Sequence, residues 1–183
     1  MAQTTCPTLR NFVADDQCLE NFAGTGTVVY FGRKADLAAK LTATENEYST
    51  PTFKEGKGLY KIDCQDEGQQ IQGSSLGQNN GFKLQFDFTV EMVDKITSII
   101  GRALNNYRDL FFIVKDGDVS QIMYDPDRKV KFDSDSLKTD TGKAASDDRL
   151  TTGSATLQPV KYPNLFVAEP TSGDWDELLA EEA

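Results

Sequence analysis

One segment near the middle of the chain limits the possible folds more than any other. From position 82 to 89 the sequence FKLQFDFT alternates apolar and polar side chains. In an extended chain, alternate side chains point to opposite faces, so the apolar residues share one face: Phe82, Leu84, Phe86 and Phe88. The segment therefore predicts a β-strand that is buried on one face and solvated on the other.

The spacing of apolar residues then changes. Over residues 92–104 they recur every three or four positions with charged residues between them, which predicts an amphipathic helix. Thr89 is the expected N-cap, and because position 92 is Met no reciprocal capping box is expected. Ile96 is expected in the core, so Ile96→Asp would bury an unpaired charge and prevent soluble folding.

Shorter segments with strand-like composition surround these two elements. They are residues 25–31, 59–64, 109–115, 119–124, 129–132, 150–160 and 164–168, with a turn at 116–118. Strands that follow one another through short turns pair in antiparallel fashion. The expected fold is mainly β, an antiparallel β-sandwich or small barrel with one packed amphipathic α-helix.

The length of the chain, 183 residues, predicts a single domain over 1–183. Four segments in it are expected outside the main elements: an N-terminal arm at 1–24, a long loop at 42–81, a polar loop at 133–149 and an acidic C-terminal tail at 169–183. Trp175, Leu178 and Leu179 would allow the tail to dock as a short helix. No signal peptide is expected, and no apolar run reaches the ~18 residues that a membrane span requires.

The composition argues against several classes of function. There are 29 acidic and 19 basic residues, a formal net charge of −10, which disfavours a protein that neutralises nucleic-acid phosphates with a broad basic face. The chain has no histidine, so mechanisms that need an imidazole base or ligand are excluded. Cys6, Cys18 and Cys64 are odd in number and lack a CxxC pair, which favours reduced thiols.

Motif-like stretches lack part of the chemistry that they suggest. Acid pairs in polar turns are more typical of solvated loops than of glycosidase carboxylates. The segment that starts at Asp133 resembles a calcium loop, but Leu137 replaces a ligand and Lys138 stands at the glycine position. Gly24, Gly26 and Gly142 lack the other residues of a phosphate-binding loop. No catalytic residue, metal or cofactor is therefore expected, and the chain is not expected to be an enzyme.

The predicted strands, loops and helix follow one another in a specific order along the chain. It comprises a glycine-bounded strand (GTGTVVYFGR), a long loop, the GFKLQFDF strand leading into the EMVDKITSIIGRALNN helix, a hairpin over DGD, and DTGKAASDDR followed by an alternating strand. Over roughly residues 25–168 this order resembles phage and prophage tail tube proteins, which are related to the tubes of contractile injection systems. That family folds as a β-sandwich or barrel flanked by a helix, and its subunits stack as rings.

The resemblance implies a virion structural protein that self-assembles in the cytoplasm of a bacterial host. Its partners would be copies of itself in stacked rings and other virion tail proteins, and DNA would pass through the lumen without specific binding or a membrane anchor. The N-terminal arm and the two loops would make contacts between subunits, with these interface residues: Tyr48, Phe53, Leu59, Tyr60, Asp140 and Lys143. An acidic lumen would repel phosphates and let DNA slide.

Two alternatives stay open at this point. One is another phage structural protein, such as a head decoration, neck or fibre-base component. The other is a monomeric β-sandwich module that binds carbohydrate or protein, for which Trp175 is the only tryptophan available to an aromatic platform. A tube subunit should expose a strand edge and form rings, whereas a carbohydrate module should stay monomeric.

Overall fold

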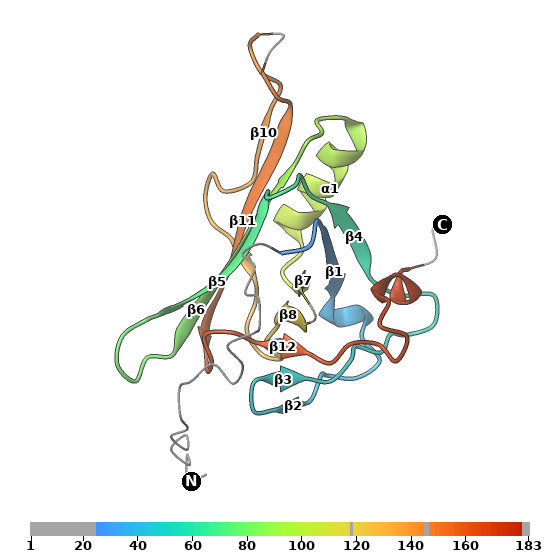
Figure 1. Cartoon of the computed structure of the whole chain (residues 1–183), viewed down its shortest axis with the longest axis vertical. Helices are drawn as coiled ribbons and strands as arrows, with labels where there is room; N and C mark the ends of the chain where they lie inside the picture. The colour runs from blue at the N-terminus through green and yellow to red at the C-terminus, as the bar shows by residue number, and fades with distance from the viewer. Residues whose placement is uncertain (1–24, 118, 145–146, 181–183) are drawn as a thin grey trace, which may run out of the picture.

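Two β-sheets and one α-helix make up the described part of the protein (Figure 1). The computed structural model describes residues 25–117, 119–144 and 147–180. Strands account for 42% and helix for 12%, and no closed barrel is present in the described part of the chain. The expected mainly-β class is confirmed, with a sandwich as the architecture.

The larger sheet has seven strands in the order β2-β3-β12-β8-β7-β1-β4. Their bounds are β1 Val28–Arg33, β2 Ala43–Thr44, β3 Glu47–Tyr48, β4 Tyr60–Asp63, β7 Leu110–Asp116, β8 Val119–Met123 and β12 Phe166–Val167. The predicted hairpin over positions 116–118 is confirmed as β7 and β8. Within this sheet only β12 and β3 pair in parallel, and the other neighbours are antiparallel.

The smaller sheet has the order β10-β11-β6-β5, and the short strand β9 also pairs with β11. The bounds are β5 Gln69–Ser75, β6 Phe82–Val90, β9 Lys131–Phe132, β10 Lys138–Asp140 and β11 Leu150–Val160. The alternating segment is β6, as predicted, with its apolar face buried at Leu84, Phe86 and Phe88. Its position beside β11 makes β6 a central strand of this sheet.

The core lies between the two sheets and continues behind the larger one. The rings of Phe86 in β6 and Phe112 in β7 lie 5.3 Å apart between centroids and join the two layers. Strand β7 is buried on both faces from Leu110 to Val114, which explains its continuous apolar run. On its far side, Phe111 meets the ring of Tyr124 edge-on at 6.0 Å.

The C-terminal segment covers part of that far side. Its docked helix was predicted and is present as a single 3₁₀ turn, η2 Trp175–Leu178. Trp175 is only 2% exposed, and its indole Nε1 donates to Ser120 Oγ at 3.1 Å. The backbone N–H of Leu59 donates to the carbonyl of Leu178, and the N–H of Ala180 donates to the carbonyl of Leu59.

Both internal segments predicted as loops contain strands. Residues 42–81 contain β2, β3, β4 and β5, and the predicted strand at 59–64 is β4. Residues 133–149 contain β10, which pairs with β11. Strand β5 escapes a pattern search because Ile71 is the only large apolar residue in QQIQGSS, so backbone pairing with β6 holds it in place.

The helix α1 spans Lys95–Asn106, later than expected. The predicted N-cap at Thr89 was wrong because that residue is still paired in β6, opposite Thr152 of β11. Asp94 is the N-cap, and its carboxylate accepts from the Thr97 backbone N–H at 2.7 Å. The Thr97 hydroxyl accepts in return from the Asp94 N–H at 2.8 Å. A reciprocal capping box is therefore present, further along the chain than the position considered in the sequence.

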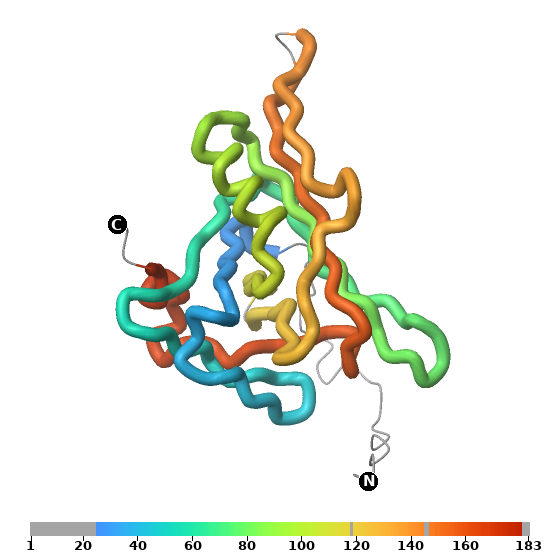
Figure 2. The backbone as a smooth tube through the Cα atoms, turned by 180° about the vertical axis from the view of Figure 1, so that it is seen from behind, coloured from blue at the N-terminus to red at the C-terminus, as the bar shows by residue number. Residues whose placement is uncertain are grey.

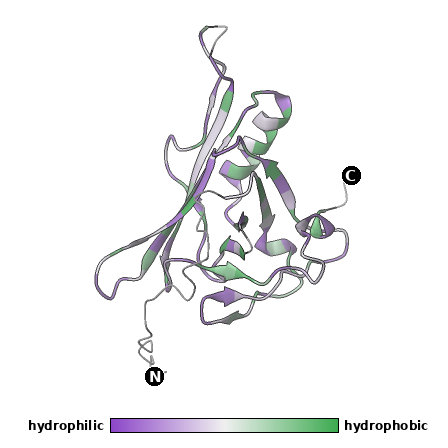
Figure 3. Ribbon diagram, viewed as in Figure 1, coloured by the Kyte–Doolittle hydropathy of each residue, from purple (hydrophilic) through white to green (hydrophobic). Residues whose placement is uncertain are grey.

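Only one side of α1 is packed. Leu104 is its one fully buried residue among those described, and Ile100 packs partly against the core. Ile96 is 63% and Ile99 69% exposed, so the expected burial of Ile96 was wrong. Figure 3 shows that α1 carries both hydrophobic and hydrophilic residues. Apolar residues extend over more of the surface of α1 than the rest of the described fold covers. The large side chains of Ile96 and Ile99 are therefore left in solvent.

The exposure of Ile96 gives the first testable prediction. The substitution Ile96→Asp is expected to cost less free energy of unfolding than a substitution in the core, because the Ile96 side chain is 63% exposed on the described fold. Leu104→Ala on the packed side should cost about 2–5 kcal/mol. Urea unfolding followed by circular dichroism compares the two, and a larger loss for Ile96→Asp than for Leu104→Ala would contradict this packing.

Candidate assembly interface

One edge of the smaller sheet is an open strand. β5 pairs with β6 in unbroken register from Gln69↔Phe88 to Ser75↔Phe82, and no described strand lies on its other side. Edge strands usually carry lysine, proline or a bulge that prevents pairing with another chain. The sequence of β5, QQIQGSS, contains no charged residue and no proline. Nothing in this strand therefore opposes the addition of a further strand.

The backbone groups on the open side can be assigned from the ladder. The Leu76 N–H, just beyond β5, donates to the Gly81 carbonyl at 2.9 Å, which is a bond towards the β6 side. Along an antiparallel strand, successive residues direct their N–H and C=O groups to alternate sides. Ser75, Gly73 and Ile71 therefore direct theirs away from β6. These groups form a row of donors and acceptors for a neighbouring strand.

The opposite edge of the same sheet is also open. There β9 and β10 lie beside β11, and neither has a second partner strand among the described residues. All three residues of β10 are exposed. Because the two edges differ in sequence and length, pairing of one edge with the other is head-to-tail, and such contacts close into rings or continue as filaments.

The outer face of this sheet is polar. The register places these residues on it: Gln70, Gln72, Ser74, Lys83, Gln85, Asp87, Thr89, Lys131, Lys138, Asp140, Leu150, Thr152, Ser154 and Thr156. Amides and hydroxyls predominate, and three lysines stand against two aspartates. The acidic residues that give the chain its net charge are therefore not concentrated on this face.

Two hairpins extend from the sheet in opposite directions (Figures 1 and 2). In the hairpin of β10 and β11, the Asp140 carboxylate accepts from the Gly142 N–H at 2.9 Å. The Asp147 carboxylate accepts from the N–H groups of Lys143 and Ala144, both at 2.8 Å. These bonds organise the described part of the turn, so an exposed hairpin reaches beyond the body with local order.

The predicted interface residues fall into separate places. Asp140 and Lys143 lie in the projecting hairpin. Tyr48 in β3 of the larger sheet and Phe53 in the segment after it are half-buried, and Tyr48 meets Tyr124 edge-on at 5.1 Å. Leu59 is fully buried, so it is a core residue with no side chain available to a partner. Tyr60 is exposed beside α1, 5.5 Å from the ring of Phe31. The structure does not join these residues into one surface.

The open β5 edge is the feature that the sequence interpretation missed. Glutamine and glycine suggested a loop at this position. The available signal was indirect: a strongly alternating strand at 82–90 that follows the glycines at 77 and 81 favours a hairpin partner just before them. The predicted N-terminal arm, 1–24, lies outside the described residues.

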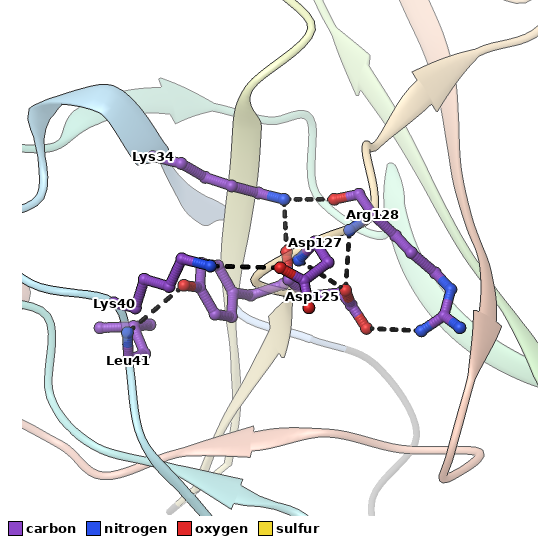
Figure 4. Close-up of polar contacts among 7 residues, drawn as sticks. Lys34, Lys40, Leu41, Asp125, Asp127 and Arg128 are labelled. Carbon is purple, nitrogen blue, oxygen red and sulfur yellow. Dashed lines mark hydrogen bonds and ion pairs between the residues drawn. The ribbon is translucent and has the colours of Figure 1, made fainter.

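A polar cluster on the larger sheet has a structural role (Figure 4). The Lys34 ammonium donates to the backbone carbonyls of Asp125 and Arg128, and burial lowers the pKa of this lysine. The Lys40 ammonium lies 3.2 Å from the Asp127 carboxylate. Lys34 belongs to the 3₁₀ turn η1, Lys34–Asp36, and the two carbonyls belong to the turn after β8. The cluster therefore holds these two turns together.

Asp125 in this cluster predicts a pH dependence. Partial burial acts to raise the pKa of its carboxyl, but hydrogen bonds from the N–H groups of Asp127 and Arg128 and from the Arg128 guanidinium outweigh burial and lower it. A lowered pKa stabilises the fold above the unfolded pKa, about 4, and this stabilisation is lost as the pH falls through the folded value. The difference in unfolding free energy between wild type and Asp125→Asn should therefore shrink below about pH 4. A difference that stays constant between neutral pH and strongly acidic pH would contradict this account.

No group of three His, Cys, Asp or Glu side chains in the described part lies close enough to hold a metal ion. Burial of Cys64, together with the nearby Asp63 carboxylate, raises the pKa of its thiol to about 12, so it is a poor nucleophile. None of the described helices is long and apolar enough to cross a membrane.

Comparison with known proteins finds no matching family model, no matching curated protein and no matching solved structure. The functional argument therefore depends on the residues and geometry of this chain.

Proposed function

We propose that this protein is a structural subunit that assembles with copies of itself through the two edges of its smaller sheet. In this proposal β5 of one copy pairs with the β9–β10 edge of the next. The observation that carries the proposal is the uncharged, proline-free β5 edge, which lies across the same sheet from a second open edge. Head-to-tail pairing with a rotation that closes gives a ring.

Among ring-forming proteins, we propose a repeating subunit of a phage tail tube. The element order resembles that family, and the sheet, the adjacent helix and the projecting hairpins support the comparison. Strands from successive copies would form a continuous wall around a lumen, and the hairpins would reach the rings above and below. Such a protein would assemble in the bacterial cytoplasm and function in the virion, with other tail proteins as partners.

The polar face of the smaller sheet would line the lumen in this arrangement. The charges of its three lysines and two aspartates nearly cancel. The lining would therefore be close to neutral, and not strongly acidic as the net charge of the chain suggests. A lining of amides and hydroxyls offers no dense row of cations to phosphates. DNA would then move through it without the salt-dependent retention that many lysines or arginines cause.

A proline at Ser75 tests the pairing directly. The N–H of Ser75 is on the open side of β5, so Ser75→Pro removes a donor from the edge and leaves the bonds to β6 in place. Ser75→Thr is the matched control, because it retains both the N–H and the hydroxyl that accepts from Gly77. Size-exclusion chromatography with light scattering should show assembly of the wild type and the threonine variant. The fraction of Ser75→Pro that assembles should fall roughly tenfold, as expected for a lost hydrogen bond and a steric block at the edge.

Two results would count against the proposal. If the wild type stays monomeric at every concentration and salt level, the subunit does not assemble by itself. If both Ser75 variants assemble like the wild type, the contact does not use the β5 edge. Thermal unfolding of each variant as a monomer separates an edge effect from a folding defect.

A further inference from the structure

The solvent side of α1 carries an apolar stripe, defined here as Ile96, Ile99 and Ala103. Ile96 and Ile99 are among the most exposed large apolar residues in the described part of the chain. Lys95 and Arg102 lie beside Ile99 at helical spacing and form a basic border. An exposed apolar helix face with a charged border is typical of a surface that receives another segment.

Two of the hollows beside the stripe would accept side chains. One, of about 220 Å³, is lined by residues that include Ile96, Ile100 and Phe88. The other, of about 340 Å³, is lined by residues that include Ile99, Ala103 and Tyr60. The first hollow is lined mainly by apolar residues, whereas Arg33, Asp36 and Lys57 also line the second.

The first described residue of the chain lies near the first hollow. The Thr25 hydroxyl donates to the backbone carbonyl of Gln69, and the Gln69 side-chain amide donates to the Thr25 carbonyl at 2.9 Å. Gln69 is paired opposite Phe88, which lines the smaller hollow. The 24 residues before Thr25 are therefore attached one strand away from this hollow.

The sequence of these 24 residues complements the surface. Its large apolar residues are Met1, Leu9, Phe12, Val13, Leu19 and Phe22, and its three acidic residues, Asp15, Asp16 and Glu20, outnumber its one basic residue, Arg10. The apolar set can fill the hollows, and the acids can face the basic border of α1.

The connection to the described fold is short. Cys18 lies about seven positions before Thr25, a span of roughly 15 Å for a flexible chain. A tether of this length gives an effective concentration on the order of millimolar. That value is far above the concentration of a second copy in dilute solution, so the segment of the same chain is the favoured occupant.

We propose that residues 1–24 dock on the α1 stripe of the same chain, with their apolar side chains in the two flanking hollows. This inference concerns the isolated subunit and does not depend on the proposed function. It assigns an occupant to the largest apolar side chains that the described helix leaves in solvent.

Disulfide trapping in the full-length protein tests the proposal. Ile99→Cys is made in a Cys6→Ser background, so that Cys18 is the intended partner thiol and buried Cys64 is the only other one. Mild oxidation at low micromolar concentration is followed by peptide mapping, with isotopically light and heavy protein mixed.

The matched control is Val119→Cys in the same Cys6→Ser background. Val119 is also exposed, and it precedes Ser120, which pairs with Lys115 in the hairpin. The Lys115 carbonyl accepts from the Gly26 N–H, so the control position is also close to the point where residues 1–24 join the fold. Proximity to the tether therefore favours the control.

The expected result is a disulfide within one chain between Cys18 and the thiol introduced by Ile99→Cys. It should form at least tenfold faster than the disulfide between Cys18 and the thiol introduced by Val119→Cys. Equal rates in the two variants would overturn the proposal, because the tether alone would then bring the thiols together.

Two further outcomes of the Ile99→Cys experiment would also overturn the proposal. Disulfides that join Cys18 of a light chain to position 99 of a heavy chain would show that a second copy supplies the segment. Dimers linked through position 99 of both chains would show that the stripe packs against another copy of α1.

Discussion

Replacing Trp175 with alanine is expected to lower the free energy of unfolding by about 3–5 kcal/mol, the range for large buried aromatic residues. The indole fills a site behind the larger sheet, where its ring centroid lies 6.3 Å from that of Tyr30. Its loss would also deprive the buried Ser120 Oγ of a hydrogen-bond donor. The neighbouring bond from the Tyr30 hydroxyl to Asp176 would be weakened as the 3₁₀ turn loses its anchor.

Trp175→Phe is the matched control, because it retains an aromatic ring and removes the indole N–H. It should be intermediate between the wild type and Trp175→Ala. Urea unfolding followed by far-UV circular dichroism avoids dependence on tryptophan fluorescence, which both variants lose. If Trp175→Ala unfolds at the same urea concentration as the wild type, the C-terminal segment is not part of the cooperative fold.

Gly73→Ala is the second substitution with a large expected effect. A Cβ at this position in β5 would stand 1.8 Å from the carbonyl oxygen of Pro163 and 2.6 Å from its carbonyl carbon. These are backbone atoms, which cannot relieve the contact by a change of rotamer. The segment around Pro163 and strand β5 must therefore move apart. The expected cost is about 1–3 kcal/mol or more, as for other overpacked sites. Assembly should also decrease, because the displaced strand is the proposed contact edge.

Gly26→Ala provides the steric control for Gly73→Ala. The closest atom to a Cβ at Gly26 is the Lys115 carbonyl oxygen at 3.6 Å, an ordinary contact. Its effect should stay within about 0.5 kcal/mol. Thermal unfolding of both variants measures the contrast. Equal stability of the two would mean that β5 and the Pro163 segment approach each other less closely than the structure has them.

Local patterns predicted the strands whose apolar residues alternate regularly or form a continuous run. Alternation predicts strand β6, and two apolar runs around a glycine turn predict the hairpin of β7 and β8. The start of α1 was misplaced because Thr89 satisfies its backbone in the sheet, and cap preference alone cannot show this. The burial of Ile96 was predicted wrongly because helical spacing does not show how much of the helix the two sheets cover.

The candidate interface was the hardest part to predict. Strand β5 has little apolar content because its position at an edge leaves most of it in solvent. Its backbone pairing is set by β6, which lies later in the chain. The charge of the polar face could not be predicted from the sequence either. It depends on the register of five strands and not on the total composition.

Negative-stain electron microscopy of the purified full-length protein tests the central claim most directly. The account predicts rings with a central hole, or stacks of such rings, in the wild type and in Ser75→Thr, and mostly single particles in Ser75→Pro. A uniform field of single particles for the wild type at concentrations up to the solubility limit would contradict it.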